Sequence, residues 1–117
     1  MRKVTEGGLQ MEEKVIAVYV MVWEKELKQE DGGSYDAPLA RQKESCLRFI
    51  KEKLGDASVE NTQVYTRRKD LFLDIERQRV SCLVVQSLDR LGSSEEELAG
   101  ILFELQMAGI ELLLVTK

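Results

Sequence analysis

The 117-residue sequence contains no histidine, two cysteines, one proline and few aromatic residues. Without histidine, the chain lacks the commonest general base and the commonest metal ligand, which excludes Ser-His-Asp and Cys-His catalytic sites. Cys46 and Cys82 lie in apolar segments and are expected to be two buried, reduced thiols rather than a redox pair. We therefore expect neither a metal nor a cofactor, and the scarcity of aromatic residues predicts an aliphatic core.

Long apolar runs and a strong positive charge are also missing. No run is long enough to cross a membrane and no basic-then-apolar leader opens the sequence, so we expect a cytoplasmic protein with no membrane partner. The net charge of −4 disfavours a free-standing nucleic-acid binder. Basic residues nevertheless gather in segments 41–53 and 67–79. They form either ordinary solvated helix faces, the favoured interpretation, or a basic docking face.

The segments that are present alternate between strand-like and helix-like patterns. Residues 15–23 read VIAVYVMVW, nine apolar residues in succession, which predicts a strand buried on both faces, as in a parallel sheet. The charged and then glycine-rich segment 24–36 predicts a loop. Pro38 suits the first turn of a helix, and the segment 94–97, Ser-Glu-Glu-Glu, is a capping box. We expect further strands near 62–66, 80–88 and 110–115, and helices near 38–54, 69–78 and 94–108.

This order of elements, β-α-β-α-β-α-β, predicts the fold class. Strands that alternate with helices pair in parallel through right-handed crossovers. We therefore expect a three-layer α/β domain with a mainly parallel four-stranded sheet and helices on both faces. The length suits one domain, for which we take residues 15–117, preceded by a flexible N-terminal tail over 1–14.

A site in such a fold lies at the carboxyl ends of the strands. The residues expected at that edge are Trp23 and Glu24 after the first strand, Thr66, Arg67 and Arg68 after the second, and Asp89 and Arg90 after the third. Two or three arginines at one edge either bind a phosphate through paired contacts or form a solvated rim. No glycine-rich phosphate loop follows the first strand, which excludes the common nucleotide-binding motifs.

Three segments carry a resemblance to a known family. They are VYVMVW at 18–23, PLARQ at 38–42 and SLDRLG at 87–92, and they resemble the catalytic domain of serine site-specific recombinases, the resolvase/invertase family. The similarity runs from about residue 15 to residue 115, and the SLDRLG segment is its most specific part. The resemblance implies a resolvase-like fold and an origin in site-specific DNA recombination by strand exchange, as in mobile elements.

The departures from the family pattern concern the reaction itself. In the family the first strand reads Tyr-x-Arg-Val-Ser and the third ends in Asp-Arg-Leu-x-Arg. The nucleophilic serine then falls on Trp23, the first-strand arginine on Met21 and the last arginine on Ser93. An indole cannot attack a phosphate, and two of the cations that stabilise the transition state are missing. We therefore expect an inactive domain, a pseudoenzyme, with a vestigial site made of Met21, Trp23, Gln42, Arg67, Arg68, Asp89, Arg90 and Ser93.

The resemblance also implies the partners. The family's dimerising helix and DNA-binding domain follow its fourth strand, so we expect DNA to bind weakly to this chain in isolation, and a second copy or another recombinase to be its protein partner. The alternative is a non-enzymatic protein-interaction or regulatory α/β module. A receiver-like module using Asp89 lacks the acidic pair after the first strand that a metal would need.

The retained pair, Asp89 and Arg90, is expected to serve conformation rather than catalysis. Asp89 would accept hydrogen bonds from backbone N–H groups or from Arg67 or Arg68. Arg90 would lay its alkyl stem across Trp23 and keep its guanidinium in solvent. On this basis Asp89→Ala should lower stability more than Arg90→Ala.

Overall fold

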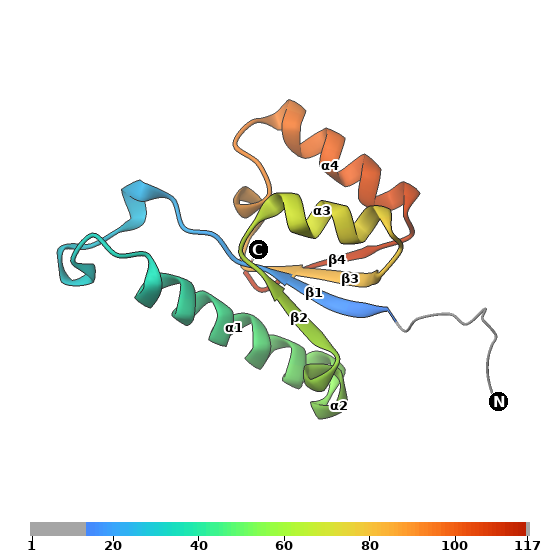
Figure 1. The fold of residues 1–117 in the computed structure, drawn as a ribbon, viewed down its shortest axis with the longest axis horizontal. Helices are drawn as coiled ribbons and strands as arrows, with labels where there is room; N and C mark the ends of the chain where they lie inside the picture. The colour runs from blue at the N-terminus through green and yellow to red at the C-terminus, as the bar shows by residue number, and fades with distance from the viewer. Residues whose placement is uncertain (1–13, 117) are drawn as a thin grey trace.

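A computed structural model describes residues 14–116, in which four strands form one sheet (Figure 1). The strands are β1 (Val15–Tyr19), β2 (Thr62–Tyr65), β3 (Val80–Val85) and β4 (Glu111–Leu114). Their order is β2-β1-β3-β4, and every neighbouring pair is parallel. The predicted parallel sheet is confirmed. The predicted tail lies outside the described residues, apart from its last residue, Lys14.

Helices cover both faces of this sheet, which confirms the three-layer prediction. They are α1 (Asp36–Leu54), α2 (Asp56–Glu60), α3 (Arg68–Glu76) and α4 (Glu95–Met107). Figure 1 shows α1 and α2 on one side of the sheet and α3 and α4 on the other. The short α2, between α1 and β2, was not predicted. Over residues 14–116, no helix is long and apolar enough to span a membrane.

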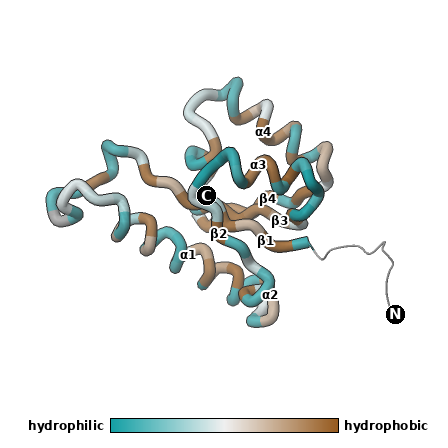
Figure 2. The backbone as a smooth tube through the Cα atoms, viewed as in Figure 1, coloured by the Kyte–Doolittle hydropathy of each residue, from teal (hydrophilic) through white to brown (hydrophobic). Residues whose placement is uncertain are grey.

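Alternate residues of the strands build two aliphatic cores, one on each face. On β1, Ala17 and Tyr19 face the core beneath α3 and α4, whereas Ile16 and Val18 face the core beneath α1. In Figure 2 the tube is mostly hydrophobic along β1, β3 and β4, and hydrophobic residues alternate with hydrophilic ones along the helices. Because both faces of β1 are covered, its apolar residues run without interruption, and this is the signal that identified it in the sequence.

The first and third strands end earlier than predicted, at Tyr19 and Val85 rather than near 23 and 88. The last ladder contact of the first strand is the bond from the Val20 N–H to the Tyr65 carbonyl, at 3.0 Å. Beyond it, the backbone of Met21 is held by a side chain of α1 and leaves the sheet. Both strands are followed by 3₁₀ turns, η1 (Glu24–Glu26), η2 (Gln29–Asp31) and η3 (Leu88–Arg90). The turns η1 and η3 carry Glu26 and Arg90 of the candidate site.

The predicted cap of α4 is confirmed in one half only. The Ser94 hydroxyl accepts the N–H of Glu97 at 3.2 Å, as expected of an N-cap serine. The Glu97 carboxylate does not return a bond to the N–H of Ser94. It accepts the N–H of Ser93 at 2.9 Å instead, because its other oxygen is drawn toward Arg68.

Both cysteines are buried and free in the core beneath α1, as predicted. Burial raises the pKa of each thiol to about 11, so only about 0.1% of each is thiolate at pH 8. We expect Cys46 and Cys82 to react with a disulfide reagent about 100-fold or more slowly in the native protein than in concentrated urea. A colorimetric thiol assay in both solvents measures this. Rapid labelling of either thiol in the native protein would contradict it.

Candidate functional site

Arg90, at the carboxyl end of β3, is bound by a glutamate that lies far away in the sequence. Its Nη2 donates to Glu26 Oε2 at 2.7 Å, and its Nη1 donates to Glu26 Oε1 and, at 3.1 Å, to the Met21 carbonyl. The Arg90 side chain is only 12% exposed. Its Nε is also buried, without a partner among residues 14–116, and so is not offered to solvent. The hydrogen bond with Arg90 lowers the pKa of Glu26, and the same bond raises the pKa of Arg90.

Gln42 connects this pair to helix α1. Its Oε1 accepts the N–H of Met21 at 3.0 Å, and its Nε2 donates to the carbonyl of Met21 at 2.9 Å. Gln42 is 7% exposed and is the buried polar residue of the described chain. The Met21 carbonyl therefore accepts from both Gln42 and Arg90, while Glu26 Oε1 also accepts the N–H of Trp23 at 2.7 Å. We call Met21, Trp23, Glu26, Gln42 and Arg90 the Arg90 cluster.

A second arginine at the same edge of the sheet is neutralised in the same way. Arg68 Nη1 donates to Glu97 Oε2 at 2.7 Å, and the guanidinium lies 5.7 Å from the centre of the Phe72 ring. The other oxygen of Glu97 accepts the N–H of Ser93. That bond and the one from Arg68 lower the pKa of Glu97. Arg68 and Ser93, both predicted site residues, are thus joined through a carboxylate.

The remaining two predicted residues lie outside these clusters. Arg67 is 77% exposed and lies 3.9 Å from the carboxylate of Asp70. Asp89 is exposed and accepts the hydroxyl of Ser87. The expected bonds from Arg67 or Arg68 to Asp89 are therefore wrong, because Asp70 and Glu97 are nearer partners on α3 and α4. The expected solvent-exposed guanidinium of Arg90 is also wrong.

These contacts define what the edge can do chemically. Each of its three predicted arginines has a carboxylate partner, and two of the pairs have charge-assisted hydrogen bonds of 2.7 Å. A phosphate that approached Arg90 would have to displace a carboxylate and would leave that negative charge beside its own. The described part of the chain also holds no group of three residues suited to a metal ion. Arg90 and Arg68 are therefore closed by hydrogen-bonded carboxylates, whereas Arg67 is only loosely paired at an exposed position.

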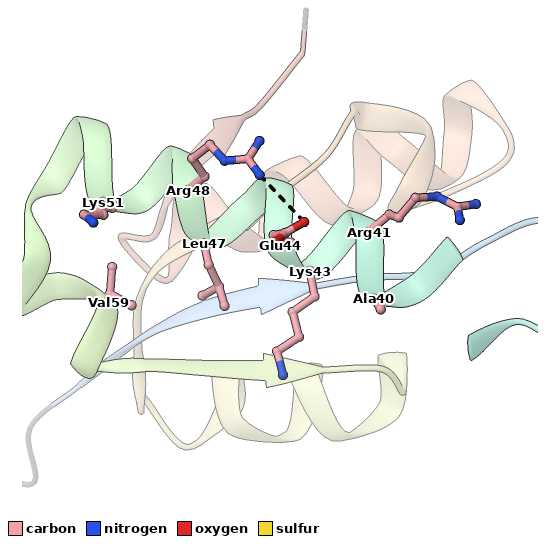
Figure 3. A pocket seen from close by; sticks show the side chains of 8 residues that line it. All are labelled: Ala40, Arg41, Lys43, Glu44, Leu47, Arg48, Lys51 and Val59. Atoms are coloured by element: carbon pink, nitrogen blue, oxygen red, sulfur yellow. Dashed lines mark ion pairs between the residues drawn. The ribbon is translucent and has the colours of Figure 1, made fainter. Parts of the chain in front are cut away.

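The basic residues of α1 line a separate groove on the outer side of α1 and α2 (Figure 3). Lys43 and Leu47 extend from the same side of α1 there, and the apolar floor is completed by Ala40 and Val59. Three of the cations lie near acids: Arg41 is 3.6 Å from Asp31, Arg48 is 3.7 Å from Glu44 and Lys51 is 4.0 Å from Asp56. The pairs of Arg48 and Lys51 are exposed, and exposed pairs of this length contribute little and exchange readily with water or another anion. The Asp31 side chain, in contrast, is only 2% exposed.

Sequence reasoning missed both glutamates as site residues. Glu97 carried a local signal, the capping box, but that pattern indicates only a helix start. Glu26 carried none, since it lies in a charged loop without periodicity, 64 residues from Arg90. No family model matches this chain, and no curated protein sequence matches it.

Proposed function

We propose that this chain is a catalytically inactive domain of the serine-recombinase type, a cytoplasmic protein that acts by association rather than by DNA strand exchange. The proposal is supported by the three sequence segments that resemble the family and by a parallel α/β fold compatible with it. Two buried free thiols suit a reducing compartment.

The observation that carries the proposal is the closure of Arg90 by Glu26. In the family this arginine meets the phosphate, so it must be free to bind an anion. Here a carboxylate holds it in a paired geometry, inside a cluster that Gln42 fixes to α1. A hydrogen bond to a charged group is worth about 1.5–3 kcal/mol, which phosphate would have to recover before it bound. The retained arginine thus serves the fold rather than a reaction.

The absence of a nucleophile points in the same direction. Trp23 stands at the position of the family's serine, and its backbone N–H is engaged by Glu26. Both thiols are buried, and burial raises their pKa values, so neither replaces the serine. The uncharged residues Met21 and Ser93 stand where the family has two arginines. Several kcal/mol of transition-state stabilisation is missing as a result.

We expect neither the wild-type chain nor Trp23→Ser to form a covalent adduct with DNA. The substrate is a negatively supercoiled plasmid that carries the genomic DNA flanking the protein's own coding sequence, and the readout is a denaturing gel. An active serine recombinase on its own sites serves as the positive control. A wild-type adduct that survives denaturation would overturn the proposal.

The second candidate function is a protein-interaction or regulatory module with no connection to recombination. The α1–α2 groove favours it, because an apolar floor beside the loosely paired cations Arg48 and Lys51 suits an acidic partner. The two functions differ in their partner. If the first function holds, this chain should bind a serine recombinase encoded beside it and change the strand-exchange rate of that recombinase. If the second function holds, this chain should do neither.

A further inference from the structure

The α1–α2 groove has a regular pattern of charge along helix α1. Six of the α1 residues that line it form two rows at a spacing of one helical turn: Ala40, Glu44 and Arg48 in the first, and Lys43, Leu47 and Lys51 in the second. The second row places a cation about 6 Å before Leu47 and another about 6 Å after it along the helix axis. This surface therefore presents an apolar side chain between two positive charges.

The apolar part of the groove is fixed by the interior of the protein. Leu47 of α1 and Val59 of α2 are both partly buried and pack against the core beneath α1. In Figure 3, Leu47 extends from the same side of α1 as Lys43. Because this floor exists before a partner arrives, little ordering is needed on binding.

The cations around the floor are available to a partner. Lys43 has no ion-pair partner among residues 14–116. Arg48 and Lys51 are 62% and 66% exposed, and the carboxylates nearest to them, 3.7 and 4.0 Å away, are more exposed still. The lining holds four cations against one acid, Glu44. An incoming carboxylate is therefore attracted to the groove and displaces only weak, solvated pairs.

We propose that the α1–α2 groove binds an acidic segment of another protein, in which an apolar side chain lies between two carboxylates. The apolar side chain packs on Leu47 and Val59, and the carboxylates pair with Lys43 and Lys51. The inference rests on association as the proposed role of this chain, and it gives that role a surface and a partner chemistry.

The same geometry disfavours other anions. Lys43 and Lys51 lie about 12 Å apart along the axis of α1, so a single phosphate cannot reach both. None of the described residues that line the groove is aromatic, so unpaired bases have no ring on which to stack. The backbone of a DNA duplex makes no use of an apolar floor. An acidic peptide uses the cations and the floor together.

Fluorescence anisotropy with the full chain tests the proposal. The probe is a fluorescein-labelled peptide of about nine residues that repeats Glu-Leu-Glu, which is long enough to span the groove. We expect a Kd of about 10–100 μM at low salt, and binding about tenfold weaker for Lys43→Glu. The matched control is Lys69→Glu, which makes the same change of charge at an exposed lysine of α3, across the sheet, and should leave binding unchanged.

Changes in the peptide keep the test independent of folding. Serine in place of leucine should weaken binding about fivefold or more, because the floor loses its contact, and lysine in place of glutamate should abolish it. No binding of the Glu-Leu-Glu peptide, equal binding of the serine peptide, or equal weakening by Lys69→Glu would overturn the proposal.

Two further outcomes would assign the groove to a different occupant and so contradict the proposal. They are a DNA duplex that displaces the peptide, and a dimer of the chain alone that Lys43→Glu dissociates in sedimentation velocity. None of these results bears on the covalent adduct with DNA, so failure of this inference and failure of the proposed function are separately detected.

Discussion

Replacing Gln42 with leucine should lower the free energy of unfolding by about 2–3 kcal/mol. The leucine fills a similar volume but makes neither of the two bonds to the backbone of Met21. The Met21 N–H is then left without its acceptor in a half-buried position, and its carbonyl retains only Arg90. Denaturant unfolding followed by circular dichroism measures the change.

The control for this prediction is Lys43→Leu, at the exposed neighbouring position of α1. It introduces the same side chain into the same helix without breaking the Arg90 cluster, so it should change stability by less than about 0.5 kcal/mol. If both variants unfold at the same denaturant concentration, the Gln42–Met21 bonds do not hold this segment in place.

Replacing Arg90 with methionine should cost about 2 kcal/mol at pH 7, because Glu26 and the Met21 carbonyl both lose a donor. Glu26→Gln should cost less, about 1 kcal/mol, since a third of that side chain is exposed and solvent screens the pair. This ranking reverses the sequence-based expectation that Asp89 matters more than Arg90. Asp89→Ala removes an exposed contact with Ser87 and a charge interaction with Arg90 that is weaker than that of Glu26, and should change stability little.

The Arg90–Glu26 pair also predicts a pH dependence. Arg90 lowers the pKa of Glu26 in the folded chain below its ordinary value of 4.5. The stability that the ionised Glu26 contributes is therefore complete above pH 4.5. It is lost as the pH falls through the pKa of Glu26 in the folded chain. The difference in the free energy of unfolding between wild type and Glu26→Gln should shrink steadily below pH 4.5. Arg67→Met, at an exposed arginine, is the matched control, and a difference that stays constant down to pH 3 would contradict the pairing.

The sheet could be predicted because its determinants are local. Apolar runs marked β1, β3 and β4, and the alternation with helices predicted parallel pairing before any contact was known. The short β2, TQVY, carries no such run and was predicted from its place in the alternation. The ends of the strands could not be predicted, because contacts made outside the strands set them. The chain leaves β1 after Val20 where Gln42, 21 residues further on, takes both backbone groups of Met21.

Candidate site residues could be named from the sequence, but the carboxylates that pair with the arginines could not. Hydrogen bonds join Met21, Gln42 and Arg90, three of the residues that the sequence analysis assigned to the candidate site. The residue that closes them, Glu26, lies in a loop whose local pattern carries no signal for a contact with η3. Similarly, the capping box placed Glu97 at the start of α4 and gave no indication that its second oxygen pairs with Arg68, 29 residues away.

The most direct test of the central claim, that Arg90 and Arg68 are closed to phosphate, is a titration of the arginine side-chain NMR signals with inorganic phosphate and with a short DNA duplex at low salt. Arg67 provides the exposed reference in the same spectrum. The account predicts that the Arg90 and Arg68 signals stay unchanged while that of Arg67 shifts, and that Arg90→Met binds the duplex as the wild type does. A saturable shift of the Arg90 signal, with loss of DNA binding in a folded Arg90→Met variant, would contradict it.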